Sequence, residues 1–212
     1  MDLSAVADEL RSRFDSKNKA REIGLSSSRS AIRACGNAIR ALHRYEWDNA
    51  EELIGEAESH LGEARTVLAD HPDVLYAGFF HDAEKEFVEA RVTHALVTDA
   101  AFPSMDDLGA TPQAYSKGMA EAIGELRRHI LDLMRRNELK RCEELLGKMD
   151  EMYYVLVSMD YPDGITFGLR RLTDVARSII ERTRGDYTTS SIQASLRATL
   201  EAHSATLEGR SP

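Results

Sequence analysis

The stretch VLYAGFFHDAEKEFVEARVTHALVTD, residues 74–99, decides the fold class of this chain. Its apolar residues recur at helical spacing, and no alternation typical of a strand interrupts them. The spacing predicts a central, largely buried helix. Glu86 and Glu89 stand one turn apart within it, and acids inside a buried helix are more informative than acids on an exposed one.

Helical periodicity also extends to both sides of this stretch. Further helices are predicted over residues 2–44, 47–70, 113–136, 138–159 and 168–184. Asp48 is a suitable N-cap for the second of these, and Gly185 is a suitable end for the last. We therefore predict an all-α fold with six to seven long helices, in a single domain over residues 1–186. The Ser/Thr-rich residues 187–212 are predicted to form a tail that is either a loose helix or disordered.

Composition narrows the class of protein. The net charge of −9 over 212 residues argues against a general nucleic-acid coat or a membrane-surface protein, although local basic stripes can still bind phosphates. Cys35 and Cys142 have no CxxC or histidine companion, which favours reduced thiols in the cytoplasm. The opening MDLSAVADEL lacks the pattern of a signal peptide, and no apolar run approaches the roughly 20 residues of a membrane span. We expect a cytoplasmic protein with no membrane contact.

A second acidic pair lies on the predicted helix 113–136, where Glu121 and Glu125 are also one turn apart. If the two helices pack together, all four carboxylates converge. Like charges at this spacing cost only about 0.2–0.5 kcal/mol per pair, so a solvated acidic face remains an alternative. The seven histidines form no spaced metal pair. Carboxylates without histidines suit Mg²⁺ or Mn²⁺.

A metal held by such acids would activate a water and neutralise charge on a phosphate. The sequence therefore raises the hypothesis of metal-dependent cleavage of a phosphate ester or anhydride. Lys85, one turn before Glu89, offers an explanation without a metal, because its positive charge could neutralise that acid. No P-loop, GxGxxG, HExxH or GxSxG motif points to another chemistry.

Three segments carry a resemblance to a known family. They are HPDVLYAGFFHDAEKEFVEARVTHALVT (71–98), YSKGMAEAIGELRRHILDLM (115–134) and YPDGITFGLRRLTDVARSIIERTRGD (161–186). In this order and spacing, over about residues 20–186, the chain resembles the translin family. It is most similar to the catalytic branch, translin-associated protein X, and to the small archaeal members.

The resemblance implies a seven-helix protomer that assembles into a barrel-like octamer around a cavity for RNA or single-stranded DNA. The catalytic branch is a metal-dependent endoribonuclease, here expected as a homo-oligomer using Mg²⁺ or Mn²⁺. Its acidic motifs match EFVE, with Glu86 and Glu89, and EAIGE, with Glu121 and Glu125. These four residues are the predicted metal ligands and catalytic residues. Glu121 stands where the family commonly has aspartate.

Nucleic-acid contacts are expected elsewhere on the chain. In the non-catalytic branch, a basic stretch with histidine precedes the first acidic pair, whereas LYAGFFHDA here offers only His81 as a potential cation. The predicted phosphate contacts are therefore arginines, namely Arg29, Arg33, Arg40, Arg44, Arg127, Arg128, Arg135 and Arg136. Two alternatives stay open: a translin-like oligomer that binds without cleaving, and an all-α Mg²⁺-dependent nucleoside triphosphate pyrophosphohydrolase of the MazG type. The second motif of that family is usually E-x-x-D.

Overall fold

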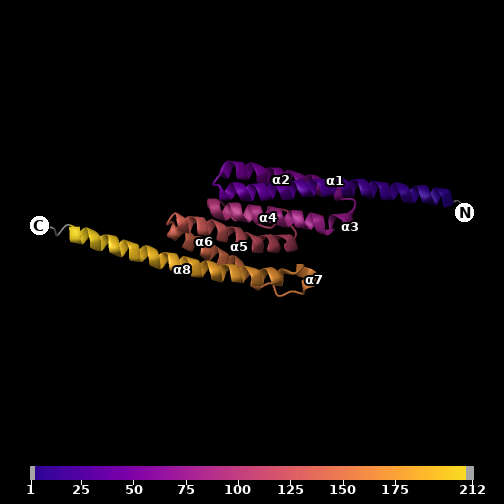
Figure 1. Ribbon diagram of the computed structural model, residues 1–212. Coiled ribbons are helices and arrows are strands. Elements are labelled where there is room, and N and C mark those ends of the chain that lie inside the picture. Colours follow the sequence, from indigo (N-terminus) through magenta and orange to yellow (C-terminus); the bar gives the residue numbers. More distant parts are fainter. Residues whose placement is uncertain (1–2, 209–212) are drawn as a thin grey trace. The chain divides into compact units, whose positions relative to one another are not determined.

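The computed structural model describes residues 3–208. Within these residues the chain forms eight helices and no strand, which confirms the predicted all-α fold. Six helices are long, and α3 and α7 have four residues each (Figure 1). The helices are α1 (Leu3–His43), α2 (Trp47–Leu68), α3 (Pro72–Leu75), α4 (Gly78–Thr98), α5 (Pro112–Arg135), α6 (Leu139–Val157), α7 (Asp163–Thr166) and α8 (Leu169–Glu208).

Three predicted helix boundaries were wrong. The helix expected over 74–99 is interrupted before Gly78, so that α3 and α4 are separate. Asp48 is not an N-cap, because α2 begins at Trp47 and the cap position is Glu46. The last helix does not end at Gly185 but continues to Glu208. The end of the predicted tail, residues 209–212, and the first residue of the predicted helix 2–44 lie outside the described residues.

The chain divides into two compact units, up to Ala122 and from Ile123 onward. In the first unit α1, α2 and α4 contact one another, as Figure 1 shows. Small side chains let these helices approach closely. The core residues that they share include Ala31, Ala34, Cys35, Ala38, Ile54, Ala57, Leu61, Phe80, Ala83, Phe87 and Ala90. This tight three-helix core holds α4 in place.

An ion pair between the buried Glu84 and the partly exposed Arg65 joins α4 to α2 and to the loop before α5. Glu84 is 3% exposed and was not singled out in the sequence. Its carboxylate accepts a hydrogen bond of 3.0 Å from Arg65 on α2 and one of 3.2 Å from the Thr111 hydroxyl. Arg65 also donates to the carbonyl of Gly109, at 2.9 Å. This network ties the loop before α5 to α2 and α4.

Glu84 gives the stability of the protein a specific pH dependence. Burial raises the pKa of Glu84 above its ordinary value of 4.5, against the opposing effect of Arg65. The Glu84 carboxyl therefore holds its proton more tightly in the folded chain than in the unfolded chain. Its contribution to the free energy of unfolding is fully present below the unfolded pKa and is lost as pH rises through the raised, folded pKa. We expect the free energy of unfolding of the wild type, relative to Glu84→Gln, to fall as pH rises from 4 to 7. Urea unfolding at several pH values measures this difference, and a difference that rises with pH would contradict the assignment.

In the second unit α6 and α8 pack together, and α7 contacts the start of α8. Cys142, Leu145, Met149 and Leu156 form the buried face of α6. Among residues 3–208 no helix combines the length and the apolar character that a membrane span requires.

Candidate metal centre

Three glutamates of the first unit come together at one point. Glu86 and Glu89 lie one turn apart on α4, and Glu121 lies on α5. One carboxylate oxygen of each lies within 4.8 Å of the others, and we call these three residues the carboxylate cluster. Glu89 is only 8% exposed, whereas Glu86 and Glu121 are partly exposed. The predicted convergence of acids from two helices is therefore present for these three residues.

Gly118 explains how α5 comes so close to α4. It lies one turn before Glu121, and a Cβ atom at this position would stand 2.6 Å from the backbone oxygen of Lys85 and 2.7 Å from Cβ of Val88. Both distances are far below ordinary van der Waals contact. Only a glycine allows this approach, so Gly118 is a positioning residue for Glu121. An isolated glycine inside a periodic helix is the sequence signal that would have identified it.

Lys85 lies inside the carboxylate cluster. Its ammonium is 2.6 Å from Oε2 of Glu121 and 3.0 Å from Oε1 of Glu86. The sequence raised the possibility that Lys85 neutralises Glu89, and these two ion pairs show that it also neutralises acids on both helices. Burial of the Lys85 ammonium disfavours its charge, but the two hydrogen bonds outweigh that effect and raise its pKa. Lys85 is therefore a firmly charged member of the site.

A thiol of α1 is affected by the same negative charge. Cys35 is fully buried in the core. Burial, and then the charges of Glu86 and Glu89, raise its pKa to about 12. The thiol stays protonated at neutral pH, so it is a packing residue and supplies no thiolate ligand.

The donor set of the cluster fits a hard divalent cation. It offers carboxylate oxygens from two helices and no thiolate or imidazole, which suits Mg²⁺ or Mn²⁺. Two oxygens bound to one Mg²⁺ lie at most about 4.2 Å apart, because each Mg–O distance is about 2.1 Å. The three carboxylate oxygens of the cluster lie up to 4.8 Å apart. A small rotation of a glutamate side chain is enough to bring them within the distance that Mg²⁺ requires.

The other predicted site residues have different surroundings. Glu125 belongs to the second unit, and its role as a fourth ligand stays a prediction. His81 lies 3.5 Å from the Lys117 ammonium. Burial, and then this neighbouring charge, lower the pKa of His81 and so disfavour its cationic form, in line with the expectation that the phosphate contacts lie elsewhere.

The predicted phosphate-binding arginines lie on α1 and α5 or directly after these helices, where Arg44 and Arg136 stand. The first four, Arg29, Arg33, Arg40 and Arg44, are exposed, and Arg44 forms an ion pair of 2.7 Å with Glu46. On α5, Arg127 donates to Asp186 at 2.8 Å and to Thr183 at 3.0 Å within the second unit. Arg128, Arg135 and Arg136 are exposed. Nothing in these contacts tests a role in binding phosphate, which stays a prediction for all eight.

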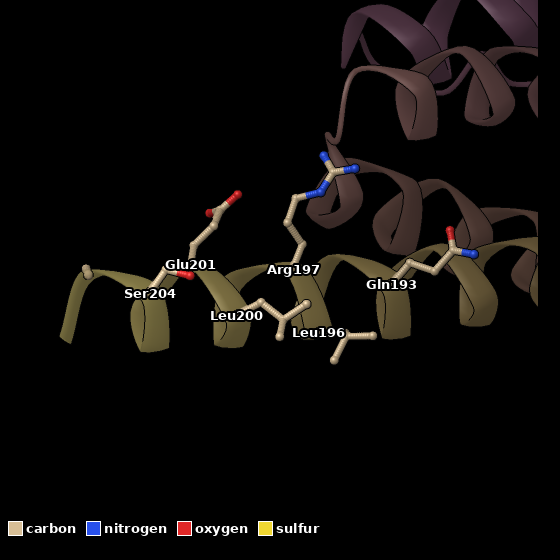
Figure 2. A pocket seen from close by; sticks show the side chains of 7 residues that line it. Gln193, Leu196, Arg197, Leu200, Glu201 and Ser204 are labelled. Atoms are coloured by element: carbon tan, nitrogen blue, oxygen red, sulfur yellow. The ribbon is translucent and has the colours of Figure 1, made fainter. Parts of the chain in front are cut away.

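A surface hollow also lies along the C-terminal part of α8. Figure 2 shows that it is lined by Gln193, Leu196, Arg197, Leu200, Glu201 and Ser204. All of these residues come from one helix, and Arg197 and Glu201 bring opposite charges one turn apart. Among residues 3–208 no second element contributes to this lining, so these residues do not form a catalytic constellation.

Comparison with known proteins identifies the family. No family model matches the chain. Over 175 residues, it is 31% identical to an uncharacterised protein of Methanocaldococcus jannaschii, covering 82% of this chain and 77% of the other. The complex of AfC3PO with duplex RNA has a TM-score of 0.82 at 31% identity, covering 88% of this chain and 97% of AfC3PO. AfC3PO is a translin-family protein. The chain belongs to the translin family.

Further solved structures agree with the translin fold. A crystal structure of AfC3PO has a TM-score of 0.81 at 31% identity over the same shares of both chains. The match to apo-NeC3PO has a TM-score of 0.79 and covers 87% of this chain and 96% of the NeC3PO chain. At 17% identity this match shows the fold alone. The translin resemblance inferred from three sequence segments is thereby confirmed.

Proposed function

We propose that this translin-family protein binds RNA and cleaves it internally in a Mg²⁺-dependent reaction. The observation that carries the proposal is the carboxylate cluster, in which oxygens of Glu86, Glu89 and Glu121 lie within 4.8 Å of one another. RNA as the substrate is supported by the 31% identity to AfC3PO, for which a complex with duplex RNA is known. Mn²⁺ would serve in place of Mg²⁺.

The chemistry follows from the cluster and its surroundings. Glu86, Glu89 and Glu121 would hold the ion. When bound, it would lower the pKa of a coordinated water and offset negative charge on the phosphate. Glu86 and Glu121 are partly exposed, so either carboxylate can orient the attacking water or accept its proton. Attack on phosphorus would break a P–O bond of the RNA backbone and leave two shorter fragments.

RNA placement would depend on phosphate contacts rather than on base edges. The eight predicted arginines are the proposed contacts, and single-stranded DNA would bind to the same residues. We also propose that the protein acts as a homo-oligomer, with an octameric cage as the expected form. Light scattering of the purified protein measures the assembly, and a monomer would remove the cage from the proposal.

The test is incubation of purified protein with end-labelled RNA, single-stranded and duplex, in Mg²⁺ or in EDTA. We expect internal fragments of single-stranded RNA in Mg²⁺ and intact RNA in EDTA. A parallel reaction with free nucleoside triphosphates tests the pyrophosphohydrolase alternative. Gel-shift titration at increasing salt measures RNA binding separately from cleavage.

Each alternative has its own result. Intact RNA in both Mg²⁺ and Mn²⁺, together with a salt-dependent shift, would leave a binding protein without nuclease activity. Release of pyrophosphate from nucleoside triphosphates, with RNA unchanged, would favour the pyrophosphohydrolase. Cleavage that persists in EDTA would contradict the metal requirement.

A further inference from the structure

The Lys85 ammonium lies among the carboxylates that would hold the metal. Its ammonium bridges the two helices of the site, because it contacts Glu86 on its own helix at 3.0 Å and Glu121 on α5 at 2.6 Å. The side chain is 15% exposed, so these carboxylates have largely replaced water around the charge. One positive charge thus offsets the repulsion among the clustered acids.

A divalent cation cannot share this arrangement. The ammonium already uses one oxygen each from Glu86 and Glu121. A unit charge and a divalent charge a few ångströms apart, in a partly buried site, repel each other by many times the thermal energy. The flexible four-carbon stem of lysine lets the ammonium swing away without movement of the helix.

We infer that Lys85 is an internal competitor for the metal. Its ammonium holds Glu86 and Glu121 together in the metal-free protein and withdraws when a divalent cation binds. The affinity of the cluster for metal is then set by the exchange of one cation for another rather than by the carboxylates alone. This inference rests on the proposed function, since it takes the carboxylate cluster to be the metal site.

The first test compares Mn²⁺ binding by the wild type, Lys85→Met and Lys17→Met. Methionine keeps an unbranched side chain but removes the charge. Lys17 is the matched control, because its ammonium pairs with Asp73 at 2.7 Å outside the cluster but in the same unit. Free Mn²⁺ is measured by electron paramagnetic resonance, with Mg²⁺ as the competing ion.

We expect Lys85→Met to bind Mn²⁺ roughly tenfold to a hundredfold more tightly than the wild type, because the ion no longer has to displace hydrogen bonds between charged groups. Lys17→Met should bind like the wild type. We also expect Lys85→Met to unfold at a lower temperature than the wild type without metal, and Mg²⁺ to stabilise it more than it stabilises the wild type.

A second measurement uses the unmodified chain, so that a poorly folded variant cannot hide the effect. An amine-reactive ester labels lysines, and mass spectrometry follows Lys85 and Lys17 with and without Mg²⁺. We expect Mg²⁺ to accelerate the labelling of Lys85 several-fold and to leave Lys17 unchanged.

The outcomes separate this inference from the proposed function. If the wild type binds Mn²⁺, and Lys85→Met binds it equally or more weakly, the competition is overturned and the metal site stands. The competition is likewise overturned, and the metal site stands, if the wild type binds Mn²⁺ but Mg²⁺ does not change the rate at which Lys85 is labelled. If neither the wild type nor Lys85→Met binds Mn²⁺, the metal site of the proposed function fails, and this inference fails with it.

Discussion

Replacement of Glu89 by glutamine is expected to lower the rate of Mg²⁺-dependent RNA cleavage by about a hundredfold to a thousandfold, the loss typical when a group that stabilises transition-state charge is removed. Glu89 is the most buried acid of the carboxylate cluster, at 8% exposed. Its amide analogue keeps the shape of the side chain but offers the ion a neutral oxygen. Single-turnover cleavage of labelled RNA measures the change.

Asp82→Asn is the matched control for this experiment. Asp82 is exposed and lies on the same helix, α4. Its replacement by asparagine removes one negative charge, as Glu89→Gln does. We expect this variant to cleave RNA at a rate close to that of the wild type. Equal activity in wild type and Glu89→Gln would show that the cleavage comes from another site or from a contaminant, and equal losses in both variants would point to net charge rather than to the cluster.

Substitution of Gly118 by alanine is the second change for which we expect a large effect. The added Cβ would stand 2.6 Å from the backbone oxygen of Lys85, and a backbone atom cannot move aside as a flexible side chain can. We expect a loss of about 1–3 kcal/mol in the free energy of unfolding, as for other overpacked cores. Because α5 would have to move away from α4, the distance from Glu121 to Glu86 and Glu89 should also increase, and metal binding should weaken.

Gly55→Ala provides the comparison. Gly55 is also inside a helix of the first unit, but a Cβ there meets no atom within 4 Å. Alanine should therefore raise the free energy of unfolding by up to about 1 kcal/mol through helix propensity. Urea unfolding and Mn²⁺ titration measure both variants. A Gly118→Ala protein as stable as Gly55→Ala, with wild-type affinity for Mn²⁺, would show that the close approach of the helices is not needed.

Much of the site was predictable because helical spacing is a local property. Glu86 and Glu89 are three residues apart on one helix, so their common face followed from the sequence. The approach of Glu121 to this pair depends on how α5 packs on α4, which no spacing within one helix determines. The pairing of Lys85 with Glu121 was not predictable for the same reason, since Glu121 lies on another helix.

The wrong helix boundaries have physical causes. At Gly185 the chain shows no left-handed residue that would end a helix, and α8 continues through it. The hydroxyls of Thr188 and Thr189 donate to the carbonyls of Arg184 and Gly185, at 2.8 and 3.1 Å. Their polar groups are thereby satisfied within the helix, so a Ser/Thr-rich composition did not stop it.

The central proposal for this protein is that the carboxylate cluster binds a divalent cation. Crystals of the protein grown with Mn²⁺, measured at a wavelength where manganese scatters anomalously, locate the ion without reference to activity. We predict one anomalous peak in contact with carboxylate oxygens of Glu86, Glu89 and Glu121, with the Lys85 ammonium turned away from them. A map with no peak at this position, and with Lys85 still bridging Glu86 and Glu121, would contradict metal binding by the cluster.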